Sequence, residues 1–138
     1  MEEQQLDTLI NTEAAELHPV LSADGNTLIF IRRLKFYDAI FQTNRQNGTW
    51  GPLVNLNPQV GSDGEFYPAC LSPDGKELFL IRTGGTSDIW VSRQTDAGWS
   101  KAEILNDRIN SKANETAAWL SNEGILYFVS DRKGGVGG

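Results

Sequence analysis

The chain has 138 residues, of which 39% are hydrophobic and 22% charged, and its net charge is −6. This length corresponds to one ordinary domain, and the hydrophobic content excludes a disordered tail. The acidic balance, without a stripe of Lys and Arg, excludes nucleic acid as a partner because phosphate binding depends on clustered cations. Apolar runs such as Leu28 to Ile31 and Leu78 to Ile81 are too short for a transmembrane helix, so we expect no membrane insertion by this segment.

The single cysteine and the first residues bear on the compartment. Because Cys70 is the only cysteine, an internal disulfide framework and a Cys-based zinc site are excluded. We expect Cys70 to be an inert thiol in the core. Met1 to Gln5 lack the basic start and apolar core of a signal peptide. Either the protein is cytoplasmic, or the chain is a piece whose targeting segment lies elsewhere.

The sequence repeats itself with a period of 49 to 50 residues, and such a repeat decides the architecture. Polar turns and apolar positions recur together in one register. The positions that share this spacing are Ser22, Ser72 and Ser121; Gly25, Gly75 and Gly124; Leu6, Leu56 and Leu105; and Ile10, Val60 and Ile109.

Each copy predicts four antiparallel strands, which we name a to d. A Ser-x-Asp-Gly turn, as at Ser72 to Gly75, joins strand a to strand b, and its Gly accepts the positive φ of a tight hairpin. Strand b has four consecutive apolar residues, as in Leu28 to Ile31. Because side chains alternate between faces of a strand, both faces of this sheet must be covered. Sheets packed on both faces at a fixed period are the blades of a β-propeller.

The chain is therefore predicted to be an all-β partial β-propeller of about two and a half four-stranded blades. The expected division is 1–12 for the end of a preceding blade, 13–60 and 61–110 for complete blades, and 111–138 for an incomplete blade. Closed propellers have about four to eight blades. We expect either a fragment of a longer propeller, which the missing half-blade favours, or an array that self-associates through its exposed blade faces.

One copy carries a family pattern: Glu65, Pro68, Ser72-Pro-Asp-Gly75, Leu78-Phe-Leu80 and Asp88-Ile-Trp90. This pattern resembles the TolB-like, WD-like propeller repeats of bacterial envelope proteins, in which the propeller often lies beside an OmpA-like, peptidoglycan-binding domain. The resemblance implies a location in the periplasm or at the outer membrane. It also implies a non-catalytic binding module that contacts a protein partner or a cell-wall component. The alternative is the accessory propeller of a prolyl oligopeptidase-like peptidase.

Residues that recur in every copy are expected to serve the blade, whereas binding residues are expected where the copies differ. The recurring carboxylates are therefore interpreted as structural. The loop between strands b and c differs most, because Arg32 to Tyr37 is replaced by Arg82 to Ser87 in the second copy. Arg and aromatic residues are frequent at interface hot spots. We therefore predict that Arg33 and Tyr37 contact a partner.

His18 and Tyr67 are the other candidate binding residues, because both lie on strand a, which lines the central channel of a propeller. His18 is the only histidine, which excludes a His-rich metal site and argues against a lyase or hydrolase that depends on clustered histidines. No Gly-x-Ser-x-Gly nucleophile motif occurs in the sequence. We therefore predict no catalytic residue, no metal site and no cofactor.

Overall fold

A computed structural model describes residues 5–135, which form three successive antiparallel sheets. The first sheet has the order β1-β2-β3, with β4 and β5 both pairing with β3. Its strands are β1 (Glu16–Leu21), β2 (Thr27–Arg33), β3 (Asp38–Gln46), β4 (Thr49–Trp50) and β5 (Val54–Asn55).

The second sheet repeats this order, with β9 and β10 pairing with β8, and the third sheet has two strands. The remaining elements are α1 (Asn57–Val60), β6 (Phe66–Leu71), β7 (Glu77–Arg82), β8 (Asp88–Thr95), β9 (Gly98–Trp99), β10 (Glu103–Ile104), β11 (Glu115–Leu120) and β12 (Leu126–Ser130). Within residues 5–135, the structure has no helix long and apolar enough to cross a membrane.

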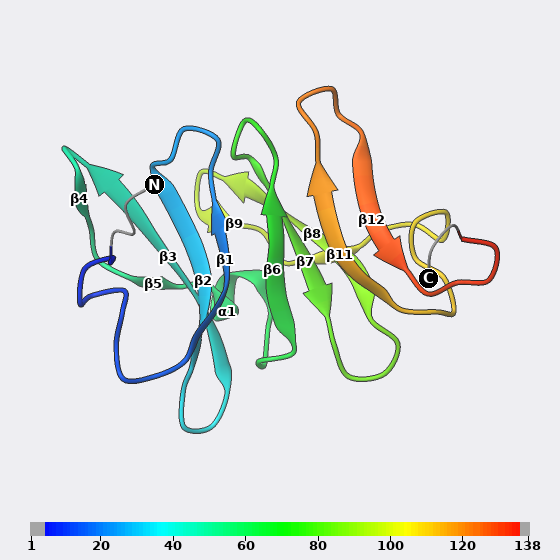
Figure 1. The fold of residues 1–138 in the computed structure, drawn as a ribbon, viewed down its shortest axis with the longest axis horizontal. Helices are drawn as coiled ribbons and strands as arrows, with labels where there is room; N and C mark the ends of the chain where they lie inside the picture. The colour runs from blue at the N-terminus through cyan, green and yellow to red at the C-terminus, as the bar shows by residue number, and fades with distance from the viewer. Residues whose placement is uncertain (1–4, 136–138) are drawn as a thin grey trace.

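The sheets follow one another across the molecule, and their first strands, β1, β6 and β11, lie next to one another (Figure 1). The a–b turns gather at one end of the sheets, called here the turn end. The loops between strands b and c gather at the other end, called here the loop end (Figure 1). Two five-stranded sheets, in which two short strands stand in the place of the fourth strand, and one two-stranded sheet in this succession confirm the predicted all-β partial propeller.

The alternating apolar residues of β2 and β7 explain this stacking. Ile29 and Ile31 are buried against the second sheet, together with Leu78 and Leu80 of β7. The intervening residues of β7, such as Phe79, belong to a separate cluster against the third sheet. Each sheet therefore contributes to cores on both of its faces, as four consecutive apolar residues in one strand predict.

The predicted Ser-x-Asp-Gly turns form as expected. In the first, the Ser22 hydroxyl donates to Asp24 Oδ1 at 2.6 Å and accepts the backbone N–H of Thr27 at 2.9 Å. Gly25 closes the turn with φ 72°, a conformation that costs a residue with a Cβ. These hydrogen bonds hold the pKa of Asp24 below its ordinary value, with the Ser22 hydroxyl as the largest cause. The recurring aspartate therefore serves the turn.

Two local features differ from the expected strands. The fourth strand of each complete sheet is split into two short strands, and where the first of them ends a backbone N–H donates to strand c, from Gly51 to the Asn44 carbonyl and from Ser100 to the Arg93 carbonyl, both at 2.8 Å. A single helical turn, α1, follows the first sheet, although the sequence shows no helical periodicity. Pro58 lies in the first turn of α1, and Gly61 ends it with φ 78°. This turn is too short to produce an amphipathic pattern.

Candidate functional site

Three Glu–Arg pairs fix the loop end of the sheets. In each, the Glu lies at or just before the start of strand a and the Arg lies at or just beyond the end of strand b. The pairs are Glu16–Arg32 (3.0 Å), Glu65–Arg82 (3.8 Å) and Glu115–Arg132 (2.9 Å). The assignment of Arg32 to the variable loop is therefore wrong, because its side chain makes the same pairing as those 50 and 100 residues later.

Two of these arginines also bind the turn that precedes their sheet. Arg32 Nη2 donates to the carbonyls of Leu9 and Ile10 at 3.0 and 2.9 Å. Arg132 Nη2 donates to the carbonyl of Ile109, which is the residue equivalent to Ile10 in the repeat. The arginine thus joins the first and third sheets to the turns before them, and the backbone there is held in place.

A cavity of about 230 Å³ opens at this loop end between the first two sheets. It brings together three of the four predicted binding residues, His18, Arg33 and Tyr67. The lining residues with polar or charged side chains are His18, Arg33, Asp38, Glu65, Tyr67 and Thr83. The cavity therefore combines a cation, two carboxylates and two aromatic rings in a small volume.

His18 and Tyr67 stack directly, with ring centroids 4.4 Å apart and planes inclined by 23°. They come from β1 and β6, the first strands of neighbouring sheets. His18 has φ 51°, and the pairing of β1 with β2 shifts just beyond it, between Leu17 and Val20. This bulge re-aims the imidazole, and bulges with unusual backbone angles are frequent beside binding sites.

Tyr67 extends the contact to the third sheet. Its hydroxyl donates to the carbonyl of Thr116 in β11 at 3.0 Å. Burial raises the pKa of Tyr67 above its ordinary value, so the phenol keeps the proton that this hydrogen bond requires. The stacked pair is consequently one surface shared by all three sheets.

Arg33 is held by Asp38 from the opposite side of the b–c loop. The guanidinium makes two hydrogen bonds to the carboxylate, Nε to Oδ1 at 3.1 Å and Nη2 to Oδ2 at 3.2 Å. Such two-point pairing fixes the plane of the guanidinium. The hydrogen bonds and charge of Asp38 raise the pKa of Arg33, so it is always cationic. The Arg33 side chain is still 61% exposed and accessible to a partner.

Tyr37, the fourth predicted residue, does not line this cavity. It lines a neighbouring one of about 410 Å³ with Asn55, Asn57 and Ser62, and its hydroxyl accepts a hydrogen bond from Asn55 Nδ2 at 3.2 Å. Gly64, which lines the cavity of the other three residues, lies close to Tyr37, since an added Cβ there would be 3.3 Å from the Tyr37 Cβ. Tyr37 therefore lies beside the cavity of the other three residues, across a position that requires glycine.

The side chains around the cavity of His18, Arg33 and Tyr67 are suited to binding a partner. No hydrogen bond joins His18 to a hydroxyl or a carboxylate within residues 5–135, and its ring contact is to Tyr67. Across the same range, no cluster of three or more His, Cys, Asp or Glu could hold a metal ion. A fixed guanidinium, carboxylate acceptors and a flat aromatic stack can recognise a polar or charged side chain of a partner.

Sequence analysis did not assign Asp38, Glu65 or Thr83 to the site. Asp38 and Glu65 recur in the repeat and were therefore interpreted as structural only. Both do have structural partners, yet both also line the cavity. Thr83 donates its hydroxyl to the Glu65 carbonyl at 3.0 Å. The signal that could have identified them is the strand register, which places the start of strand a beside the end of strand b.

This chain is similar to a known protein in its fold, whereas no match to its sequence is found. No protein-family model matches the sequence, and no curated protein matches it. Among solved structures, TolB from Acinetobacter baumannii matches with a TM-score of 0.61 at 19% identity, over 91% of this chain and 29% of that one. The chain thus spans less than a third of the length of that structure. The likeness shows that the fold of this chain is similar to a part of the TolB β-propeller.

Proposed function

We propose that this chain is a non-catalytic binding module of a bacterial cell-envelope protein, and that its loop end contacts a protein partner. The TolB-like fold and the repeat pattern of envelope propellers support the location in the periplasm or at the outer membrane. The contact is argued from the loop end itself.

The observation that carries the proposal is the asymmetry of the b–c loops. In the first sheet, this loop presents Phe36, which is 86% exposed, and Tyr37 beside the cavity that contains Arg33. The second sheet has Gly84 and Gly85 in the corresponding loop. A backbone hydrogen bond from Leu34 N–H to the Tyr37 carbonyl at 3.0 Å closes the first loop. Exposed aromatic residues beside a fixed arginine are typical of interface hot spots.

Site-specific photo-crosslinking tests this proposal. A photoreactive phenylalanine analogue replaces Phe36 in the full-length protein, and crosslinking is carried out in cells that express it naturally. The matched control carries the same analogue at Lys76, an exposed position in the a–b turn at the opposite end. We expect a discrete crosslinked protein at position 36 only. Equal crosslinking at both positions, or none at position 36, would contradict the proposal.

The captured partner then allows a direct affinity measurement. We expect Arg33→Ala and Tyr37→Ala to weaken binding by about tenfold or more each, the effect of losing a hot-spot residue. Lys76→Ala should leave the affinity unchanged. Unchanged binding after both loop substitutions would show that the partner contacts another surface.

A further inference from the structure

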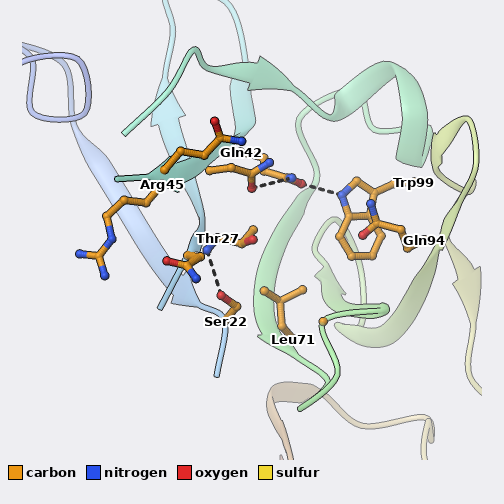
Figure 2. Close-up of a pocket in the computed structure, with 11 residues that line it drawn as sticks. Ser22, Thr27, Gln42, Arg45, Leu71, Gln94 and Trp99 are labelled. Carbon is orange, nitrogen blue, oxygen red and sulfur yellow. Dashed lines mark hydrogen bonds between the residues drawn. The ribbon is translucent and has the colours of Figure 1, made fainter. Parts of the chain in front are cut away.

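A second cavity, of about 220 Å³, lies between the same two sheets at the turn end, opposite the candidate site (Figure 2). Its lining is dominated by side-chain amides and one indole. These residues are Asn26, Gln42, Asn44, Gln46, Gln94 and Trp99. Five amides around one small cavity form the most distinctive polar grouping at this end of the molecule.

The amides of β3 are not required by the blade. Gln42, Asn44 and Gln46 occupy alternate positions on this strand and so share one face of the sheet. The residues 49 positions later, in the repeat, are Val91, Arg93 and Thr95. Val91 is buried in the core between the second and third sheets, so an apolar residue serves the blade at this position. The amide row is therefore a feature of the first sheet alone.

Two of the amides are held in a defined orientation. The Trp99 indole N–H donates to Gln42 Oε1 at 2.7 Å, and Gln42 Nε2 donates to Asn44 Oδ1 at 3.3 Å (Figure 2). Trp99 is itself buried in the core between the sheets, which fixes the start of this chain of hydrogen bonds. The cavity wall is thus preorganised, and preorganised polar groups bind a ligand at a lower entropic cost.

Other amides keep their hydrogen-bonding capacity. Within residues 5–135, the side-chain amides of Gln46 and Gln94 make no hydrogen bond to protein groups. Arg45, the one charged lining residue, directs its guanidinium away from Trp99 and Gln94 and over the ring of Trp50 at 5.4 Å (Figure 2). Apart from Arg45, the lining of the cavity is therefore polar but uncharged.

We propose that this cavity binds a saccharide unit. A side-chain amide offers donors and an acceptor together, and each sugar hydroxyl is also both a donor and an acceptor. A charged ligand would lose its hydration and find no counter-charge among the five amides. The volume is below the roughly 300–1,000 Å³ of pockets that enclose drug-sized ligands, which suits a single ring better than an extended chain.

Saccharide titration followed by NMR tests this inference on the full chain. The probes are chitobiose, which carries acetamido groups, and cellobiose, which carries only hydroxyls. We expect saturable shifts of the Trp99 indole N–H and of the Gln42 and Gln94 side-chain amides. Saturation by either probe supports the proposal, and a preference between them defines the contribution of the acetamido group.

The variant Gln46→Ala/Gln94→Ala provides the decisive comparison. Both side chains are exposed, so this variant should fold normally, and we expect its affinity to fall by about tenfold or more through the loss of two hydrogen bonds. Asn122→Ala, an exposed amide in the turn of the third sheet, is the matched control and should bind as the unmodified chain does. No saturable shift at millimolar probe, or equal binding by all variants, would overturn the proposal. Neither outcome bears on the protein contact at the loop end.

Discussion

Glu115 and Arg132 form an ion pair in which the carboxylate is completely buried and the guanidinium is partly exposed, with Nη2 and Oε1 2.9 Å apart. The same carboxylate accepts the backbone N–H and hydroxyl of Ser111 and the hydroxyl of Ser130. All the hydrogen bonds of a buried charge are therefore supplied by two turns and one strand end. Such a network holds the third sheet to the loop end of the second.

Removal of this buried carboxylate should destabilise the fold strongly. Glu115→Ala leaves Arg132 and two serine hydroxyls without their acceptor, and we expect a loss of about 3 kcal/mol in the free energy of unfolding. Urea denaturation followed by tryptophan fluorescence measures it. Glu103→Ala, which breaks an exposed pair with Arg93, is the control and should cost less than about 1 kcal/mol. Equal losses in the two variants would contradict the network.

The same carboxylate predicts a dependence of stability on pH. Burial opposes ionisation of Glu115, but hydrogen bonds from Ser130, Ser111 and Arg132 outweigh it, and its net pKa is lowered from the ordinary 4.5. A lowered folded pKa contributes stability that is present above pH 4.5 and is lost as the pH falls through the folded value. We expect urea midpoints to fall on acidification below pH 4.5, less steeply in Glu115→Gln.

The effect of Asp88 on stability should depend on pH in the opposite direction to that of Glu115. Burial, and then the negative charge of Glu115, raise its pKa above the ordinary 3.8, although Arg82 acts in the other direction. A carboxyl with a raised folded pKa costs stability as the pH rises through that value. We expect Asp88→Asn to be more stable relative to the unmodified chain at neutral pH than at pH 3, measured by thermal unfolding. A difference that does not change with pH would contradict this assignment.

Cys70 should be unreactive in the folded protein. Its side chain lies in the core between the second and third sheets, and burial raises the pKa of the thiol. Because the thiolate is the reactive form, we expect no labelling by a disulfide reagent until the chain unfolds. Lys76→Cys places a thiol in an exposed turn and serves as the positive control. Rapid labelling of native Cys70 would show that the two sheets separate readily.

The outer face of the third sheet should support association between copies of this chain. The rings of Trp119 and Tyr127 pack against each other, tilted by 32° with centroids 5.6 Å apart, and both residues and Val129 are more than half exposed. Large exposed apolar patches mark interaction surfaces. We expect sedimentation of the 138-residue chain to show concentration-dependent association that Trp119→Glu abolishes and Phe36→Glu, at an exposed loop aromatic, leaves unchanged. A monomer at all concentrations would contradict it.

The propeller could be predicted from the sequence because strand alternation and repeat spacing are local signals. Leu28 to Ile31 indicated a sheet covered on both faces, and Asp24 and Gly25 indicated the turn, without knowledge of distant contacts. The helical turn α1 was missed because four residues hold no periodicity. The structural role of Arg32 was missed because its carbonyl acceptors, such as that of Ile10, lie in a different part of the repeat.

The candidate site was only partly predictable for a related reason. His18 and Tyr67 could be placed on strand a from the repeat, but their stacking depends on the bulge in β1 and on the packing of two sheets. Sequence spacing cannot show that Arg33 shares their cavity while Tyr37 does not. The close approach of Gly64 to the Tyr37 side chain is likewise a tertiary contact that sequence spacing does not show.

The hydrogen bonds from Arg32 and Arg132 to the preceding turns also determine where the repeat can be divided. The turns that contain Ile10 and Ile109 are each covalently part of one copy, yet these carbonyls accept hydrogen bonds from the arginine of the next. A cut between such a turn and the sheet that follows it would leave that arginine and those carbonyls without these hydrogen bonds. A shortened or rearranged form of the chain is therefore expected to keep them only where the turn stays joined to the sheet that follows it.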